Sequence, residues 1–199
     1  MNLIYGLLLS FLTAAAPHKD ATRLKIGIVY YNQLDRDLKK QLVSNITETY
    51  NCTVTEIDGI RKVPDNAYYK PRGRYRADGL LVDLGSIAGL DKVIAITSKD
   101  ISSTKGNIYD WGIIGLGSCP GKCCVISTYR IKTSNKVLFN DRLIKAAIHE
   151  LGHTMGLPHC TYNDSCVMSA GDGTAKSLDS ENRTFCSHCL QLLSLLNTH

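Results

Sequence analysis

The 199-residue sequence contains no internal repeat and no low-complexity segment, and after residue 16 no apolar run is long enough to cross a membrane. These absences leave no sign of a second domain or of a stable membrane span. The net charge is only +5, and the segment 61–76 carries an excess of that size. No nucleic-acid motif accompanies this basic segment, so a solvated loop is favoured over a nucleic-acid surface.

The residues that are present suffice for one folded domain. Hydrophobic residues make up 44% of the chain, which allows one substantial core over residues 21–199. We therefore expect a single domain that acts as a monomer, with no nucleic acid among its partners.

The N-terminal residues 3–16 form the one long apolar stretch of the sequence. Its length and its small residues at 14–16 are typical of a secretory signal peptide, and it is too short to span a bilayer comfortably. Against this interpretation, only the α-amino group supplies positive charge, and Pro17 would directly follow the cleavage site. Residues 1–20 are expected to be the signal peptide of an exported (periplasmic or secreted) protein, or else the buried or disordered N-terminus of a cytoplasmic one.

Residue patterning predicts alternating strands and helices. Runs rich in branched residues predict strands at 24–31, 52–57, 92–97 and 123–131, while apolar positions at helical spacing predict helices at 34–50, 77–88, 139–155 and 186–196. A long loop is expected at 156–182. This order favours an α+β fold with a single mixed, twisted β-sheet that has an antiparallel edge strand.

The expected edge strand lies in the glycine-rich segment 108–118, just before the strand at 123–131. Pro120 and Gly121 stand where a type II turn prefers them, so the two strands are predicted to form a hairpin. Glycines weaken a strand but let another backbone approach closely. An extended substrate could therefore add to this edge, and the residues expected to align it are Ile113, Ile114, Gly115 and Leu116.

The strongest chemical signal is the pattern H-E-x-x-H-x-x-G-x-x-H. His149 and His153 are four residues apart, so on a helix both imidazoles face one side and can bind one metal ion. Glu150 is rotated beside the metal, where it can reach a metal-bound water. Gly156 can end the helix and reverse the chain, which returns His159 as a third ligand. Three histidines and one open position are the pattern of a catalytic zinc.

Four cysteines follow this motif and predict a second metal site. Cys186 and Cys189 form a C-x-x-C knuckle near a helix start, and Cys160 and Cys166 complete a tetrahedral set suited to a structural zinc. Two disulfides are the alternative in an oxidising compartment. Because Cys160 directly follows His159, an ion held by the cysteines would also fix the loop that delivers the third histidine.

The remaining cysteines are Cys52, Cys119, Cys123 and Cys124. In an exported chain they are expected to pair, with Cys119 meeting Cys123 or Cys124 across the Pro-Gly turn.

The run 149–189 resembles the archaemetzincins, metzincin-clan zinc peptidases with a three-histidine site, a methionine turn and a four-cysteine second zinc. The resemblance includes the seventeen residues between Met168 and Cys186. It implies a metzincin-like zincin with a C-terminal four-cysteine zinc knuckle, two Zn²⁺ ions, and Met168 beneath the catalytic metal. The sequence departs from the family's usual pattern in two places: five residues rather than four separate Cys160 from Cys166, and no tyrosine directly follows Met168.

The function expected from these residues is zinc-dependent hydrolysis of peptide bonds in peptides or proteins, with Glu150 as the general base. Aminopeptidase and endopeptidase activity both stay open. The alternative is a catalytically silent, zinc-stabilised peptide-binding protein, which the presence of Glu150 disfavours because metal binding alone needs no base.

Overall fold

The main sheet is built from five strands in the order β2-β1-β5-β9-β8 in the computed structural model, which describes residues 23–171 and 173–196. Their bounds are β1 (Lys25–Tyr30), β2 (Thr53–Glu56), β5 (Lys92–Thr97), β8 (Gly115–Gly117) and β9 (Cys123–Ser127). The first four strands in the sheet order are parallel, and β8 pairs antiparallel with β9 at the edge. The predicted α+β class, mixed sheet and antiparallel edge strand are therefore confirmed.

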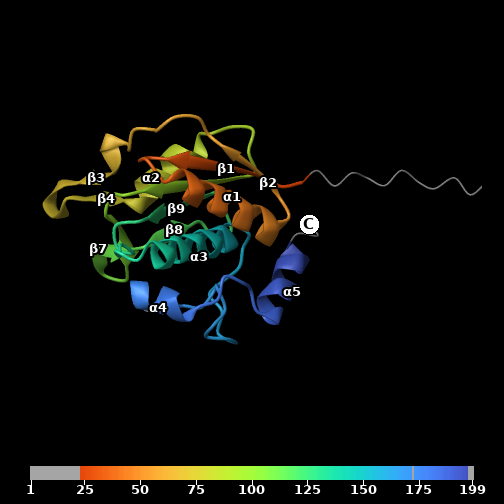
Figure 1. The fold of residues 1–199 in the computed structure, drawn as a ribbon. Coiled ribbons are helices and arrows are strands. Elements are labelled where there is room, and N and C mark those ends of the chain that lie inside the picture. Colours follow the sequence, from red (N-terminus) through yellow and green to blue (C-terminus); the bar gives the residue numbers. More distant parts are fainter. Residues whose placement is uncertain (1–22, 172, 197–199) are drawn as a thin grey trace, which may run out of the picture.

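Helices cover both faces of this sheet (Figure 1). Helices α1 (Arg36–Tyr50) and α3 (Lys136–Thr154) share one hydrophobic core with one face, and α2 (Ala77–Gly85) packs on the other. The apolar residues of α1 recur every fourth position, so Leu38, Leu42 and Ile46 are all buried. The central strand β5 is buried from Val93 onward because both of its faces are covered, as expected for parallel strands.

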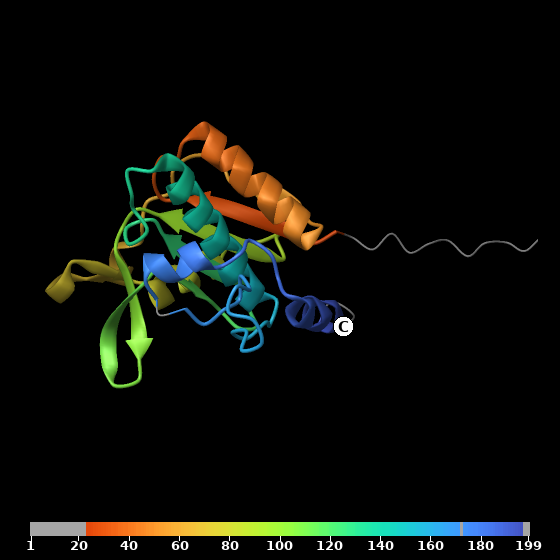
Figure 2. The same cartoon turned by 60° about the horizontal axis from the view of Figure 1, so that its bottom comes forward.

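A second, four-stranded sheet corrects the expectation of a single sheet. Its strands lie in the order β3-β4-β6-β7, with bounds β3 (Tyr68–Tyr69), β4 (Arg74–Arg76), β6 (Ile101–Lys105) and β7 (Ile108–Ile113). The glycine-rich segment is divided between the two sheets, because Ile113 pairs with Ile101 whereas Gly115 pairs with Ile126. The β6–β7 hairpin projects from the body of the molecule (Figure 2).

The basic segment is more ordered than the predicted solvated loop. It contains β3, β4 and two short 3-10 turns, η1 (Asp65–Ala67) and η2 (Lys70–Arg72). The Arg74 side chain is only 17% exposed and lies 2.7 Å from a carboxylate oxygen of Asp100 and 2.9 Å from one of Asp110. Much of the local positive charge is thus neutralised within the fold.

The turn between β8 and β9 differs from the predicted type II turn. The Cys119–Pro120 peptide bond is cis, and Gly121 does not adopt the positive φ that a type II turn requires at its third residue. The Gly121 amide instead donates a hydrogen bond of 3.1 Å to the carbonyl oxygen of Thr154. The turn is therefore fastened to the end of α3 rather than left free.

Two short helices complete the C-terminal part, α4 (Ala175–Ser180) and α5 (Ser187–Leu196). Helix α4 falls inside the stretch that the sequence assigned to a loop, whereas α5 was predicted. The apolar stretch at residues 3–16 lies outside the described residues. Among the residues that the structure does describe, no helix has the length and apolar character to cross a membrane.

Candidate active site and metal centres

The end of α3 brings the first histidines and the returning chain together. Gly156 has φ +98°, its amide donates to the carbonyl oxygen of His153 at 2.8 Å, and the Leu157 amide donates to that of Gly152 at 3.0 Å. This pair of bonds is the Schellman motif that reverses a chain after a helix. Gly156 therefore ends the helix as predicted, and the chain folds back towards His159.

The three predicted histidines converge. Their ligand atoms all lie within 4.8 Å of one another, and the Nε2 atoms of His149 and His153 are 3.0 Å apart. Nδ1 of His149 is 2.7 Å from the Val167 carbonyl oxygen, and Nδ1 of His153 is 2.8 Å from that of Leu157. Since a carbonyl only accepts, each Nδ1 carries the proton and each Nε2 offers a lone pair.

Two lone pairs facing each other at 3.0 Å repel unless a cation lies between them. For zinc with Zn–N bonds of about 2.0 Å in tetrahedral geometry, the ligand nitrogens would be about 3.3 Å apart. Burial lowers the pKa of His149 to about 3, and it also lowers the pKa values of His153 and His159. The imidazoles are thus neutral near pH 7, the form that binds a metal, and the cluster fits zinc.

Glu150 is buried beside these histidines. Burial raises the pKa of its carboxyl to about 8, with the Gly117 backbone amide opposing the rise. Strand β8 comes this close because its first and last residues lack side chains: a Cβ on Gly115 would lie 2.5 Å from Oε1 of Glu150, and one on Gly117 would lie 2.5 Å from its carbonyl oxygen. The site therefore holds a carboxyl group able to take up and release a proton near neutral pH.

Met168 lies against the helix between the two histidine positions. It is fully buried, and a Cβ added to Gly152 would lie 2.5 Å from its sulfur. Because Gly152 precedes His153, the absence of a side chain there lets the methionine pack directly on the metal-facing helix.

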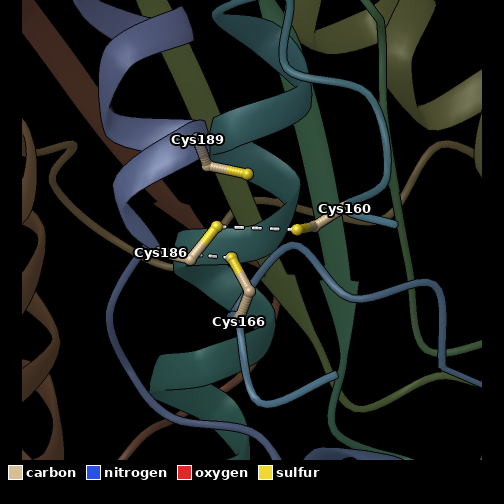
Figure 3. Close-up of side chains that lie close together, drawn as sticks. All are labelled: Cys160, Cys166, Cys186 and Cys189. Atoms are coloured by element: carbon tan, nitrogen blue, oxygen red, sulfur yellow. Dashed lines mark hydrogen bonds between the residues drawn. The ribbon is translucent and has the colours of Figure 1, made fainter. Parts of the chain in front are cut away.

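The four predicted cysteines also converge (Figure 3). Cys189 lies on α5 and Cys186 directly precedes it, whereas Cys160 and Cys166 come from the loop after α3. Sγ of Cys160 and Sγ of Cys186 are 3.6 Å apart, and all eight cysteines of the chain are free thiols. A tetrahedral zinc with Zn–S bonds of about 2.3 Å would separate its sulfurs by about 3.8 Å, whereas a disulfide would need about 2.05 Å. The cluster therefore has the dimensions of a metal site.

The electrostatics of this cluster favour a thiolate at the start of α5. The pKa of Cys186 falls to about 7 even though burial opposes the change, because the Cys189 backbone amide and the neighbouring thiols donate hydrogen bonds to it. The Cys186 amide in turn donates to Sγ of Cys166 at 3.3 Å. Thiolates are the form that binds zinc, so this donor set fits a structural ion.

The two clusters share one short stretch of backbone. The Cys160 amide donates to the Met168 carbonyl oxygen at 2.6 Å, and Cys160 and Ser169 form an isolated parallel bridge. The carbonyl oxygen of Val167 accepts from His149. The loop that carries His159 and Cys160 is thus bonded to the turn that carries Cys166 and Met168.

A cavity of about 320 Å³ opens beside the histidines. The expected substrate residues Ile113, Ile114 and Gly115 line it, together with Glu150. Leu116 does not line it and packs against the core beneath α2 instead. The segment after Met168 and α4 also line this cavity.

The chain matches the model described as Peptidase family M54 over residues 24–195. It belongs to peptidase family M54. Family membership makes the chain a zinc-dependent metallopeptidase that hydrolyses peptide bonds.

Several family relatives match over most of their length. The archaemetzincin of Halobacterium salinarum is 32% identical over 175 residues, which cover 83% of this chain and 97% of the relative. A crystal structure of an archaemetzincin from Methanopyrus kandleri is similar with a TM-score of 0.79 at 29% identity, covering 90% of this chain and 98% of that chain. Another, from Archaeoglobus fulgidus in complex with malonate, has a TM-score of 0.71 at 26% identity and covers 84% and 99%.

Several residues that line this cavity were not predicted from the sequence. Trp111 and Lys105 reach the cavity from the β6–β7 hairpin, and Leu178 and Glu181 reach it from α4 and the residue after its C-terminal end. They belong to no motif, and α4 itself was not predicted. The expected pairing of Cys119 with Cys123 or Cys124 was wrong, because all three are free thiols. The exposed Cys119 thiol instead donates to the Leu157 carbonyl oxygen at 3.5 Å.

Proposed function

We propose that His149, His153 and His159 hold the zinc ion of this peptidase and that Glu150 is its general base. The observation that carries the proposal is the placement of a buried carboxyl group beside three neutral imidazoles whose free nitrogens converge. Glu150 lies beside the histidine cluster and is not part of it. A metal site that only stabilised the fold would need no such carboxyl group.

Zinc, when bound, supplies Lewis acidity that polarises the scissile carbonyl and lowers the pKa of water. Glu150 takes the proton of the attacking water and then donates it to the nitrogen of the leaving amine. Its burial strengthens this exchange, because few water molecules compete for the carboxyl group. The Val167 and Leu157 carbonyl oxygens hold the imidazoles of His149 and His153 in one tautomer throughout.

We further propose that Cys160, Cys166, Cys186 and Cys189 bind a second, structural zinc ion. Their free thiols, their convergence and the lowered pKa of Cys186 support a metal over two disulfides. A four-sulfur set leaves no open coordination position, so this ion would stabilise the fold and take no part in the reaction.

The substrate backbone is proposed to lie along Ile113, Ile114, Gly115 and Leu116. Strand β8 is the edge strand of the main sheet, so its outer side has no neighbouring strand. An extended peptide can add there by backbone hydrogen bonds. Ile113 to Gly115 line the cavity next to Glu150, which would place the peptide bond within reach of the base.

The test is incubation of the zinc-loaded protein with a mixture of peptides and mass analysis of the products. Removal of single N-terminal residues would indicate an aminopeptidase, and internal cleavage an endopeptidase. Glu150→Gln should retain zinc and lose cleavage, whereas Glu48→Gln, an exposed carboxamide substitution on α1, should cleave as the parent does. Peptide binding without cleavage by the zinc-loaded parent, or full cleavage by Glu150→Gln, would contradict the proposal.

A further inference from the structure

Glu181 lines the cavity beside the candidate active site but has no role in either metal cluster. It directly follows α4, and the same cavity wall includes Leu178 on that helix. His149 and Glu150 line the cavity as well, so a group bound near Glu181 would lie in the same space as the bond to be cleaved.

One carboxyl oxygen of Glu181 is buried without a partner. The residue is 6% exposed, and within the described part of the chain its Oε2 has no hydrogen-bond partner. Burial raises the pKa of Glu181 to about 7, and the charge of Lys145 opposes this rise. A buried carboxyl oxygen without a hydrogen-bond partner is unfavourable in general, so its presence beside a cavity calls for a ligand group that donates a hydrogen bond to it.

The nearby cation does not satisfy Glu181. The Lys145 ammonium lies 2.7 Å from a carboxylate oxygen of Asp141 and donates to the Leu178 carbonyl oxygen at 2.8 Å. Lys105, the lysine that lines the cavity, lies over the ring of Trp111 with its nitrogen 4.7 Å from the centroid. Each of these ammonium groups is already engaged elsewhere.

A purely structural role for Glu181 is not needed to hold α4. That helix is fastened to α3 by the Arg142 guanidinium, which binds both carboxylate oxygens of Asp179 at 2.6 Å, and by the Lys145 bond to Leu178. The Glu181 carboxyl group takes no part in either contact.

We propose that Glu181 binds a cationic group of the substrate, so that the enzyme prefers peptides carrying an ammonium or guanidinium group next to the cleaved bond. The cavity volume of about 320 Å³ lies at the small end for ligand sites, which suits one side chain or one chain terminus. The cation could be a lysine or arginine side chain or a free N-terminus, and the proposal rests on the proposed peptidase function.

The experiment compares two pairs of peptides. In the first pair both peptides are N-acetylated, and one carries lysine where the other carries methionine. This comparison is repeated for each position around the cleaved bond. In the second pair the peptides lack lysine and arginine and differ only in a free or acetylated N-terminus. The ratio of kcat/KM within each pair is measured for the parent, Glu181→Gln, Glu181→Lys and the exposed control Glu48→Gln.

The parent and Glu48→Gln should favour the cationic member of at least one pair by about tenfold or more, since a hydrogen bond to a buried charge is worth that ratio. Glu181→Gln should bring the ratio towards one, and Glu181→Lys should favour the methionine peptide over the lysine peptide. If the kcat/KM ratio of the first pair depends on Glu181, the bound cation is a side chain. If the ratio of the second pair depends on Glu181, the bound cation is the N-terminus. Unchanged ratios in both Glu181 variants, or a parent without preference, would overturn the proposal.

A binding measurement separates this proposal from the peptidase function. Trp111 is the only tryptophan of the chain and lines the cavity, so its fluorescence reports binding of peptides that lack tryptophan. In the Glu150→Gln background, the cationic peptide should bind about tenfold more tightly than its neutral partner, and adding Glu181→Gln should abolish the difference. Failure of cleavage with this preference intact would contradict only the peptidase function, whereas equal binding of both peptides would contradict the role of Glu181.

Discussion

The backbone amide of Cys160 lies 2.6 Å from the carbonyl oxygen of Met168 and donates a hydrogen bond to it. This bond joins the loop of the third histidine to the methionine turn, and each of these segments also supplies a cysteine to the second cluster. The histidine cluster therefore derives part of its shape from residues that the cysteines hold in place.

Gly152→Ala should destabilise the protein and disturb the histidines. Its Cβ would lie 2.5 Å from the Met168 sulfur, so the methionine or the helix must move, at a cost of about 1–3 kcal/mol. Gly85→Ala is the matched control, because no heavy atom lies within 4 Å of its added Cβ at the end of α2. The midpoint of urea unfolding should be lower for Gly152→Ala than for the parent, and it should not be lowered in Gly85→Ala. Equal midpoints would contradict the packing of Met168 on Gly152.

Thiol reactivity should reveal whether the four-cysteine cluster holds a metal. In the native zinc-loaded protein only Cys119 should react rapidly, because it is the exposed cysteine. Removal of metal with a chelator should add the four cluster thiols, giving one plus four, or five in total. Cys119→Ser should show no rapidly reacting thiol in the zinc-loaded state and four after chelation. If chelation exposes no further thiols while a reductant does, the cysteines form disulfides and the metal interpretation is wrong.

Sequence patterns alone predicted the elements whose apolar residues recur at a regular spacing or form an uninterrupted run. Leu38, Leu42 and Ile46 predict α1, and the buried run of β5 predicts a central strand, because the burial of these residues follows from their spacing. His149 and His153 could be placed side by side for the same reason. Helical spacing fixes His149 against His153 before any tertiary contact is known.

The remaining elements depend on partners that are distant in sequence. Strand β6 carries the polar residues Ser103 and Thr104, and its strand conformation comes from pairing with β4 and β7 rather than from a hydrophobic pattern. Glu181 reaches the cavity only because α4 folds back onto α3, where Arg142 binds Asp179. Contacts of this kind, between residues distant in the sequence, cannot be predicted from the spacing of residues.

Asp179→Asn should loosen α4 and lower the free energy of unfolding at neutral pH but not in acid. The Arg142 hydrogen bond, with a smaller opposing effect of burial, holds the pKa of Asp179 below its usual 3.8. The stabilisation is therefore complete above pH 3.8 and is lost as pH falls through the lower pKa of the folded state.

Urea unfolding at neutral and acidic pH tests this prediction. The difference between the parent and Asp179→Asn should shrink as the solution is acidified. Asp65→Asn removes a highly exposed pair with Lys62 and should have little effect at either pH. A difference that is absent at neutral pH, or that grows in acid, would show that the Arg142 pair does not stabilise the fold.

The dependence of the histidine site on the cysteine site is tested most directly by counting zinc ions per chain in native mass spectra of four proteins. The parent should carry two. His153→Ala should keep the one held by the cysteines, since the bonds around Cys160, Cys166 and Cys186 do not involve that imidazole. Cys166→Ser should lose the second ion, hold the catalytic one more weakly and lose peptide hydrolysis, while Cys119→Ser behaves as the parent. A Cys166→Ser protein that keeps its catalytic zinc and its full rate of hydrolysis would contradict the account.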